Sequence, residues 1–206
     1  MSLARLLIFP LIGASLAGPS LRGQDFFGFQ AGIGFPKGEF KESTGGSAGY
    51  FLGAHQVREL GAGNVFRPRL DCYGFKGGQD LMVQTASGPV RGQLDNRFTI
   101  LSAGLESMYY LLQDTHRGPY LFGGFGGAST RLTSEGSSNP TGDASTWPLN
   151  GKLQETANKF YYSMGVGFQY DSTFGGELRY FTTRWSGGGT SMRVAFISAG
   201  VTLRLH

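Results

Sequence analysis

The stretch Lys159-Phe-Tyr-Tyr-Ser-Met-Gly-Val-Gly-Phe-Gln-Tyr-Asp171 decides the fold class. Its even-numbered positions, from Phe160 to Tyr170, are all apolar or aromatic, whereas the odd-numbered positions between them are mostly small or polar. An alternation with a period of two residues is typical of a β-strand whose two faces meet different surroundings. The stretch therefore predicts a strand with one apolar face and one small or polar face.

Seven further segments complete a set of eight predicted strands. Phe27 to Pro36 and Ala195 to Leu205 repeat the alternation clearly. The less regular segments are 48–58, 65–76, 97–112, 119–131 and 174–185. These segments are longer than the usual globular strand of about 5 or 6 residues and suit a tilted strand that crosses a bilayer, which needs roughly 9 to 11. Strand length therefore favours a membrane barrel over a β-sandwich.

The predicted connections alternate between short and long. Short turns are expected at Leu60 to Asn64, at Gln113 to Gly118 and near Asp171 to Thr173, and long outer loops at 37–47, 77–95, 132–158 and 186–192. In outer-membrane barrels with an even number of strands, the short turns and both termini face the periplasm, and the long loops face outward. The rhythm of the connections therefore predicts an orientation as well as a fold.

The N-terminus, residues 1–24, has the pattern of a signal peptide and a short lead. A positive charge at Arg5 precedes an apolar run from Leu6 to Leu16, and small residues follow, which predicts cleavage after Ala17 or at a later small residue before Gln24. The run is too short for a membrane-spanning helix, which needs roughly 20 residues. We therefore expect an exported chain whose barrel domain is 25–206.

The polar face of the predicted strands separates two kinds of barrel. A soluble barrel of the lipocalin type would turn its apolar face inward, whereas a membrane barrel turns it toward lipid. Here the polar face holds glycine, serine and threonine together with charged residues that predict a filled lumen: Arg67, Arg69, Asp71, Glu106, Glu177, Arg179 and Arg204. Aromatic residues near the strand ends suggest interfacial girdles: Phe26, Phe27, Phe35, Tyr50, Tyr109, Tyr110, Tyr120, Phe160, Tyr161, Tyr162, Phe174 and Trp185.

The glycine and aromatic motifs Phe27-Gly-Phe-Gln-Ala-Gly-Ile-Gly-Phe35 and Tyr120-Leu-Phe-Gly-Gly-Phe-Gly-Gly127 resemble those of the OmpA/OmpX-like small outer-membrane β-barrel superfamily, and the resemblance covers residues 26–206. It implies an all-β, eight-stranded, antiparallel up-and-down transmembrane barrel in the outer membrane of a Gram-negative cell. It also implies contact with outer-membrane lipid and insertion by the barrel-assembly machinery, and we expect a monomer. The C-terminal His206 departs from the aromatic residue with which such chains usually end.

The residues that carry chemistry point away from catalysis. Eight strands leave an interior just wide enough for side chains, so the charged lumen residues are expected to pair, either as a structural plug or as a gated ion path. Of three histidines, His55, His116 and His206, none has the local pattern of a serine hydrolase, although a lipid A-modifying enzyme remains the alternative. We expect no cofactor, no metal and no nucleic-acid partner, and a non-enzymatic role in envelope structure or surface interaction.

Overall fold

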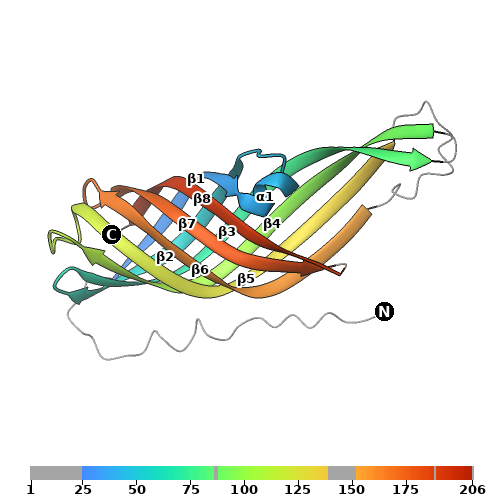
Figure 1. Ribbon diagram of the computed structural model, residues 1–206. Coiled ribbons are helices and arrows are strands. Elements are labelled where there is room, and N and C mark those ends of the chain that lie inside the picture. The colour runs from blue at the N-terminus through green and yellow to red at the C-terminus, as the bar shows by residue number, and fades with distance from the viewer. Residues whose placement is uncertain (1–24, 86–87, 139–151, 188, 206) are drawn as a thin grey trace.

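The computed structural model describes residues 25–85, 88–138, 152–187 and 189–205. The signal peptide predicted at 1–24, with its cleavage site after Ala17, and the terminal His206 lie outside the described residues. Eight antiparallel strands in sequence order close into a barrel (Figure 1). They are β1 (Asp25–Lys37), β2 (Gly49–Gly61), β3 (Asn64–Thr85), β4 (Gly88–Tyr110), β5 (Gly118–Ser138), β6 (Lys152–Gln169), β7 (Phe174–Gly187) and β8 (Thr190–Leu205). The predicted up-and-down barrel is confirmed.

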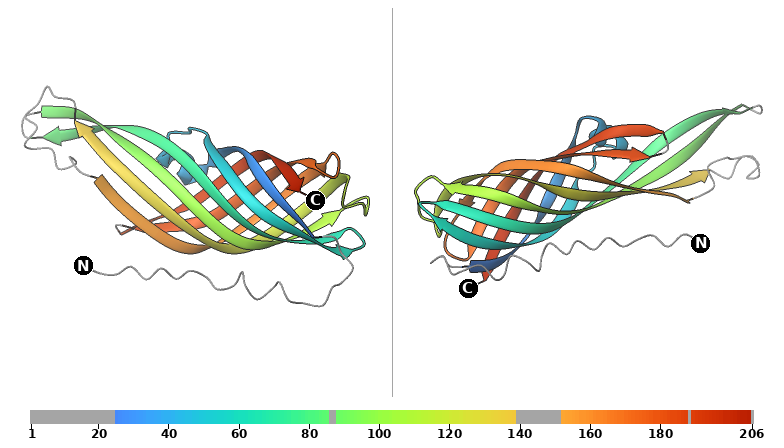
Figure 2. Two further views of the ribbon diagram at one scale, coloured as in Figure 1. Left: turned by 180° about the vertical axis from the view of Figure 1, so that it is seen from behind. Right: turned by 90° about the horizontal axis from the view of Figure 1, so that it is seen from below.

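The barrel closes where β1 pairs with β8. The register of this seam runs from Phe27 opposite Leu205 to Lys37 opposite Ala195. The start of β1 and the end of β8 thus share one end of the barrel with the short turns, and the longer hairpins extend from the other end (Figure 2). The short turns therefore share one end as the connections predict, and which end faces the periplasm stays a prediction. In the described part of the chain, no helix is long and apolar enough to span a membrane.

The two faces of each strand separate as the alternation predicts. On β6, Phe160, Tyr162 and Met164 are 78%, 64% and 61% exposed, whereas Tyr161 and Ser163 between them are almost fully buried. The apolar face therefore points outward, and the alternative of a lipocalin-type soluble barrel is wrong. Other large apolar residues exposed on the outer wall include Phe27, Phe29, Ile33, Leu52, Leu70, Leu101, Leu105, Leu121, Phe125, Val166, Phe168, Leu178 and Val201.

The lumen is filled in three layers, which can be followed along β3. Val65 belongs to an apolar cluster near the short turns, Arg67, Arg69 and Asp71 come next, and Tyr73 belongs to a larger aromatic cluster toward the long hairpins. The first cluster also holds Phe26, Val57, Met108, Tyr110, Tyr120 and Phe122. The second also holds Phe40, Phe51, Phe75, Phe98, Ile100, Tyr161, Phe181, Trp185 and Phe196. The charged residues therefore lie between two apolar layers.

The predicted aromatic girdles are only half right. Phe26, Tyr110, Tyr120, Tyr161 and Trp185 are buried on the lumen side. Those that do face outward are Phe27, Phe35, Tyr50, Tyr109, Phe160, Tyr162 and Phe174. The strand period of two separates adjacent aromatics onto opposite faces, so nearness to a strand end does not by itself place a ring at the interface.

The predicted outer loops are the main error in the sequence-based strand limits. The β3–β4 pairing continues through 77–95 as far as Thr85 opposite Gly88. Similarly, β5 and β6 extend into 132–158, of which 139–151 lies outside the described residues, and β7 and β8 pair through most of 186–192. Strands β3 to β6 therefore project beyond the rest of the barrel (Figure 1). Above a bilayer both faces of a strand meet water, so the sequence need not alternate there.

A short helix, α1 (Gly38–Ser43), occupies the remaining predicted loop, 37–47. Its Phe40 is fully buried and packs edge-on against Phe75 and Phe98, with ring centroids 4.9 and 5.1 Å away. Thr44 then ends the helix by donating its hydroxyl to the carbonyl of Phe40 at 2.9 Å. The helix thereby inserts one aromatic side chain into the outer aromatic layer of the lumen.

Candidate functional site

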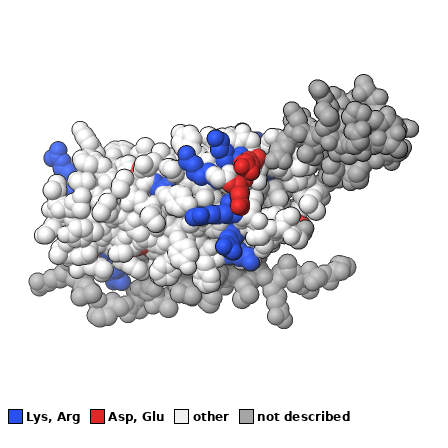
Figure 3. Space-filling view, in the orientation of Figure 1, with Lys and Arg blue, Asp and Glu red and all other residues white. Residues whose placement is uncertain are grey.

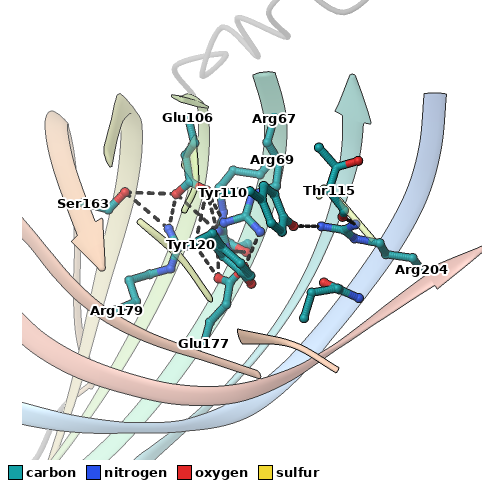
Figure 4. A network of polar contacts seen from close by, with 12 residues as sticks. Arg67, Arg69, Glu106, Tyr110, Thr115, Tyr120, Ser163, Glu177, Arg179 and Arg204 are labelled. Carbon is teal, nitrogen blue, oxygen red and sulfur yellow. Dashed lines mark hydrogen bonds and ion pairs between the residues drawn. The ribbon is translucent and has the colours of Figure 1, made fainter. Parts of the chain in front are cut away.

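The seven charged residues predicted to line the lumen are each at most 8% exposed. Six of them form one set of ion pairs in the lumen: Arg67, Arg69, Asp71, Glu106, Glu177 and Arg179. Figure 4 shows the arginines and glutamates of this set. They come from strands β3, β4 and β7, which are brought to a common centre by the curvature of the wall. We call these six side chains the lumen network.

Glu106 on β4 is the centre of the lumen network. Its Oε2 accepts hydrogen bonds from Arg67 Nε at 2.9 Å and Nη2 at 2.6 Å, and from Arg69 Nη1 at 3.0 Å. Its Oε1 accepts from Arg179 Nη1 and from the Ser163 hydroxyl, the latter at 3.1 Å. One carboxylate is thus shared by three guanidinium groups.

The other two carboxylates complete the pairing. Glu177 accepts hydrogen bonds from Arg67 and, at 3.0 Å, from Arg179 Nη2. Asp71 accepts two hydrogen bonds from the guanidinium of Arg69, from Nε to Oδ2 at 2.6 Å and from Nη2 to Oδ1 at 2.5 Å. Charge-assisted, bidentate bonds of this kind are stronger than bonds between neutral groups. Three arginines and three carboxylates leave the lumen network with no net formal charge.

Arg204 lies apart from the lumen network, although it faces the same lumen. Its guanidinium donates to the backbone carbonyl of Thr115 at 2.7 Å and to the hydroxyl of Tyr110. Within the described residues it has no carboxylate partner. The end of β8 reaches the short-turn end of the barrel, beyond the level of Glu106 and Glu177, so sharing a face does not bring Arg204 to the network.

Three uncharged residues that were not predicted for the site support it. Tyr120 donates its hydroxyl to Glu177 at 2.9 Å, and Ser163 contacts both Glu106 and Arg179. The ring of Phe122 lies 5.2 Å from the Arg67 guanidinium carbon and 4.6 Å from that of Arg179, within cation–π range. All three sit on the lumen side of β5 or β6, which strand parity could have revealed.

Two glycines make room for the lumen network. A Cβ atom at Gly53 would lie 2.1 Å from Asp71 Oδ1, and one at Gly167 would lie 2.2 Å from the ring of Tyr120. Both approaches are far shorter than any van der Waals contact. These glycines let large side chains of the neighbouring strand lie flat across the wall, which accounts for part of the high glycine content.

The two described histidines, His55 and His116, lie outside the lumen network. His55 is buried on the lumen side, its imidazole lies against Gly28, and its Nδ1 has no hydrogen-bond partner. His116 lies in the turn after β4, where its ring packs edge-on against Phe26. Within the described residues, no cluster of three or more His, Cys, Asp or Glu side chains could hold a metal ion.

The turn between β6 and β7 holds an ordered carboxylate outside the membrane-spanning wall. Asp171 Oδ1 accepts hydrogen bonds from the backbone N–H groups of Phe174 at 2.7 Å and Thr173 at 2.8 Å. Because these bonds favour the ionised form, they lower the pKa of Asp171 below its ordinary value. The turn is therefore fixed by a charged residue at the short-turn end of the barrel.

A closed barrel of eight strands with an apolar exterior and a lumen filled by side chains defines a class: the small transmembrane β-barrels of bacterial outer membranes. The fold and the apolar exterior place the chain in the outer membrane. Among solved structures it is similar to Ail, the attachment invasion locus protein of Yersinia pestis, at 11% identity, with 89% of this chain and 99% of that chain covered and a TM-score of 0.51.

Two other solved structures have a similar shape. The N-terminal β-barrel domain of Pseudomonas aeruginosa OprF has 12% identity and a TM-score of 0.48, and the alignment covers 89% of this chain and 100% of the OprF domain. Neisserial surface protein A has 14% identity and a TM-score of 0.48, covering 88% of this chain and 97% of that one. No family model and no curated protein matches the sequence. The likeness to Ail, at a TM-score of 0.51, confirms the resemblance to small outer-membrane β-barrels at the level of the fold.

Proposed function

We propose that the chain is a non-enzymatic integral protein of the outer membrane, which contributes to envelope structure or to contacts at the cell surface and does not conduct ions. The observation that carries this proposal is the pairing of Glu106, the carboxylate at the centre of the lumen network, with Arg67, Arg69 and Arg179. A conducting path needs charged groups that exchange partners with passing ions, whereas here each charge is already held by fixed partners.

The layers above and below the lumen network support a structural plug rather than a gated ion path. On the outer side, Tyr73, Phe181 and Phe196 pack ring against ring across the lumen, with centroids 4.7 to 5.4 Å apart. On the inner side, Tyr110 and Tyr120 pack at 4.8 Å. Hydrated ions would have to displace these rings before reaching the charges. The lumen then serves to stabilise the wall.

The outer wall and the projecting strands suggest the partners. The exposed apolar wall fits outer-membrane lipid, and we propose that the barrel-assembly machinery inserts the chain as a monomer. Strands β3 to β6, which extend past the other strands, offer surface for contacts outside the cell (Figure 2). Rigid elements that project from a scaffold are common places for such contacts.

Two measurements test this proposal. Fractionation of the producing cell should recover the protein in the outer membrane as a heat-modifiable band, and the purified barrel in planar bilayers should show no stable conductance steps. Recovery in the soluble fraction, or steady open-channel currents from the wild-type barrel, would overturn it. Mass spectrometry of lipid A with and without expression should show the same acyl and headgroup pattern, and a changed pattern would reinstate the enzymatic alternative.

A further inference from the structure

Two arginines stand side by side on the outer surface of the β7–β8 hairpin. Arg184 and Arg193 are directly opposite each other in the antiparallel register. Both are exposed, whereas Thr183, Trp185 and Val194, their neighbours along the two strands, are buried on the lumen side. The two guanidinium groups therefore leave the wall on its lipid-facing side.

The level of this pair in the membrane follows from the outward-facing residues of β7. From the middle of the wall toward the outer end these are Leu178, Tyr180, Thr182 and Arg184, of which Leu178 is 50% exposed. The order runs from aliphatic to aromatic to charged, which is the polarity profile of a bilayer from its hydrocarbon core to its headgroups. The arginines thus lie at the headgroup level of the outer leaflet. On the same face, basic and acidic side chains gather around α1 while much of the wall carries no charge (Figure 3).

The pair carries an electrostatic cost that no salt bridge offsets within the described residues. Like charges directly opposite each other in a sheet are destabilising. In the described part of the chain, no carboxylate forms a salt bridge with either arginine. The closest acidic contact, Glu39 Oε2, accepts the backbone N–H of Arg193 at 2.7 Å and not its guanidinium. Lys37 adds a further positive charge, because it pairs with Ala195, two residues along β8 from Arg193.

The Arg193 side chain is nevertheless held in place. Its Nε donates to the Thr182 hydroxyl at 3.2 Å and its Nη2 donates to the Tyr180 hydroxyl at 3.1 Å. These bonds hold the guanidinium against the wall and do not use its other N–H donors. A positioned arginine with donors to spare, next to a second arginine, has the geometry that binds a phosphate with two or more hydrogen bonds.

We propose that Arg184 and Arg193 bind a phosphate group of a phosphorylated lipid in the outer leaflet. The anion would lie between the two guanidinium groups and cancel their repulsion. A lipid fits better than a soluble anion because apolar side chains that can contact acyl chains, Ile197 and Leu178, lie on the same outer face beyond Thr182, toward the middle of the wall. This inference rests on the proposed location and orientation in the outer membrane, and it adds a ligand that the proposed function does not name.

The test uses the purified full-length protein in detergent and measures lipid binding by native mass spectrometry. The probes are lipid A with its phosphates, the same lipid after enzymatic dephosphorylation, and inorganic phosphate. The variants are Arg184→Gln, Arg193→Gln and the double variant, with Arg117→Gln as the control, because Arg117 is exposed in a short turn at the opposite end of the barrel. Surface arginines near phosphorylated lipid contribute roughly 1 kcal/mol each, so we expect binding about fivefold weaker for each variant and about thirtyfold weaker for both.

The wild-type protein should bind the phosphorylated lipid more tightly than the dephosphorylated one, and the control should match the wild type. Equal binding of the two lipids, an unchanged affinity of the double variant, or an equal loss in the control would overturn the inference. Inorganic phosphate that displaces the lipid at matched concentration would also overturn it, since the apolar contacts would then add nothing. Arg193→Lys, which keeps the charge, should retain more binding than Arg193→Gln. Outer-membrane fractionation, scored separately, distinguishes failure of this inference from failure of the proposed function.

Discussion

Glu106 is the carboxylate on which three arginines converge, so we expect Glu106→Gln to weaken the barrel strongly. The replacement keeps the shape of the side chain but leaves Arg67, Arg69 and Arg179 with two carboxylates, which changes the formal charge of the lumen network from zero to +1. Removing one partner of a buried ion pair costs about 3 to 5 kcal/mol, because the remaining charge stays buried. Since an amide oxygen still accepts some of these hydrogen bonds, we expect a loss near the lower figure.

The measurement is the free energy of unfolding in urea, with the barrel in lipid vesicles and the fluorescence of its tryptophans as the signal. Glu155→Gln is the matched control, because Glu155 on β6 is partly exposed and takes no part in the lumen network; we expect it to unfold like the wild type. The double variant Glu106→Gln with Arg179→Gln restores charge balance and should be more stable than the sum of the two single losses predicts. A loss below about 1 kcal/mol for Glu106→Gln, or strict additivity in the double variant, would refute the reasoning.

Three further outcomes follow from the packing and the turns. Gly167→Ala should lower the melting temperature of the heat-modifiable band, because its new Cβ would overlap Tyr120; the expected loss in free energy of unfolding is about 1 to 3 kcal/mol. Gly127→Ala is the control and should leave the melting temperature unchanged, because a Cβ there meets nothing within 4 Å. Equal effects of the two variants would contradict this prediction. Phe40→Ala should cost about 3 kcal/mol in urea unfolding, since the ring is fully buried; an unchanged midpoint would mean that α1 is not docked. The Asp171 carboxyl should titrate below 3.8 by NMR. Because the folded pKa of Asp171 is depressed, its contribution to stability is present above the unfolded pKa and is lost as pH falls through the folded pKa. The amide protection of this turn, corrected for the intrinsic exchange rate at each pH, should therefore fall in acid; a pKa at or above 3.8 would contradict the hydrogen bonds.

The strands that cross the membrane could be predicted from the sequence because their two faces meet different environments, lipid on one side and the lumen on the other. Residues Phe160 to Phe168 on β6 alternate because one face of the strand meets lipid and the other meets the lumen, and this difference repeats at every second residue. Where β3 and β4 pass through 77–95, the two faces of the strands do not meet different environments. The sequence therefore does not alternate there, and these paired strands were predicted as a loop. Helix α1 was missed for a related reason: its six residues contain one buried apolar side chain, Phe40, which gives no period to detect.

The members of the lumen network could be predicted by face, but their pairing could not. Strand parity puts Arg69 and Asp71 on the lumen side, and they do bind each other. That Glu106 meets three arginines depends on the register and curvature of strands far apart in the sequence. The same dependence separates Arg204 from the network, because strand parity fixes the face of a residue and not its depth in the lumen.

The seam between β1 and β8 has a consequence for how the cylinder can be built. It joins Phe27 to Leu205 and Lys37 to Ala195, pairs that are among the most distant in the described chain. The wall therefore cannot seal until β8 has reached β1, and pairing at such separation is slow. Because these two strands also end beside each other, a short linker from Leu205 to Asp25, with new termini opened in the projecting β3–β4 hairpin, should give a circular permutant with the same wall.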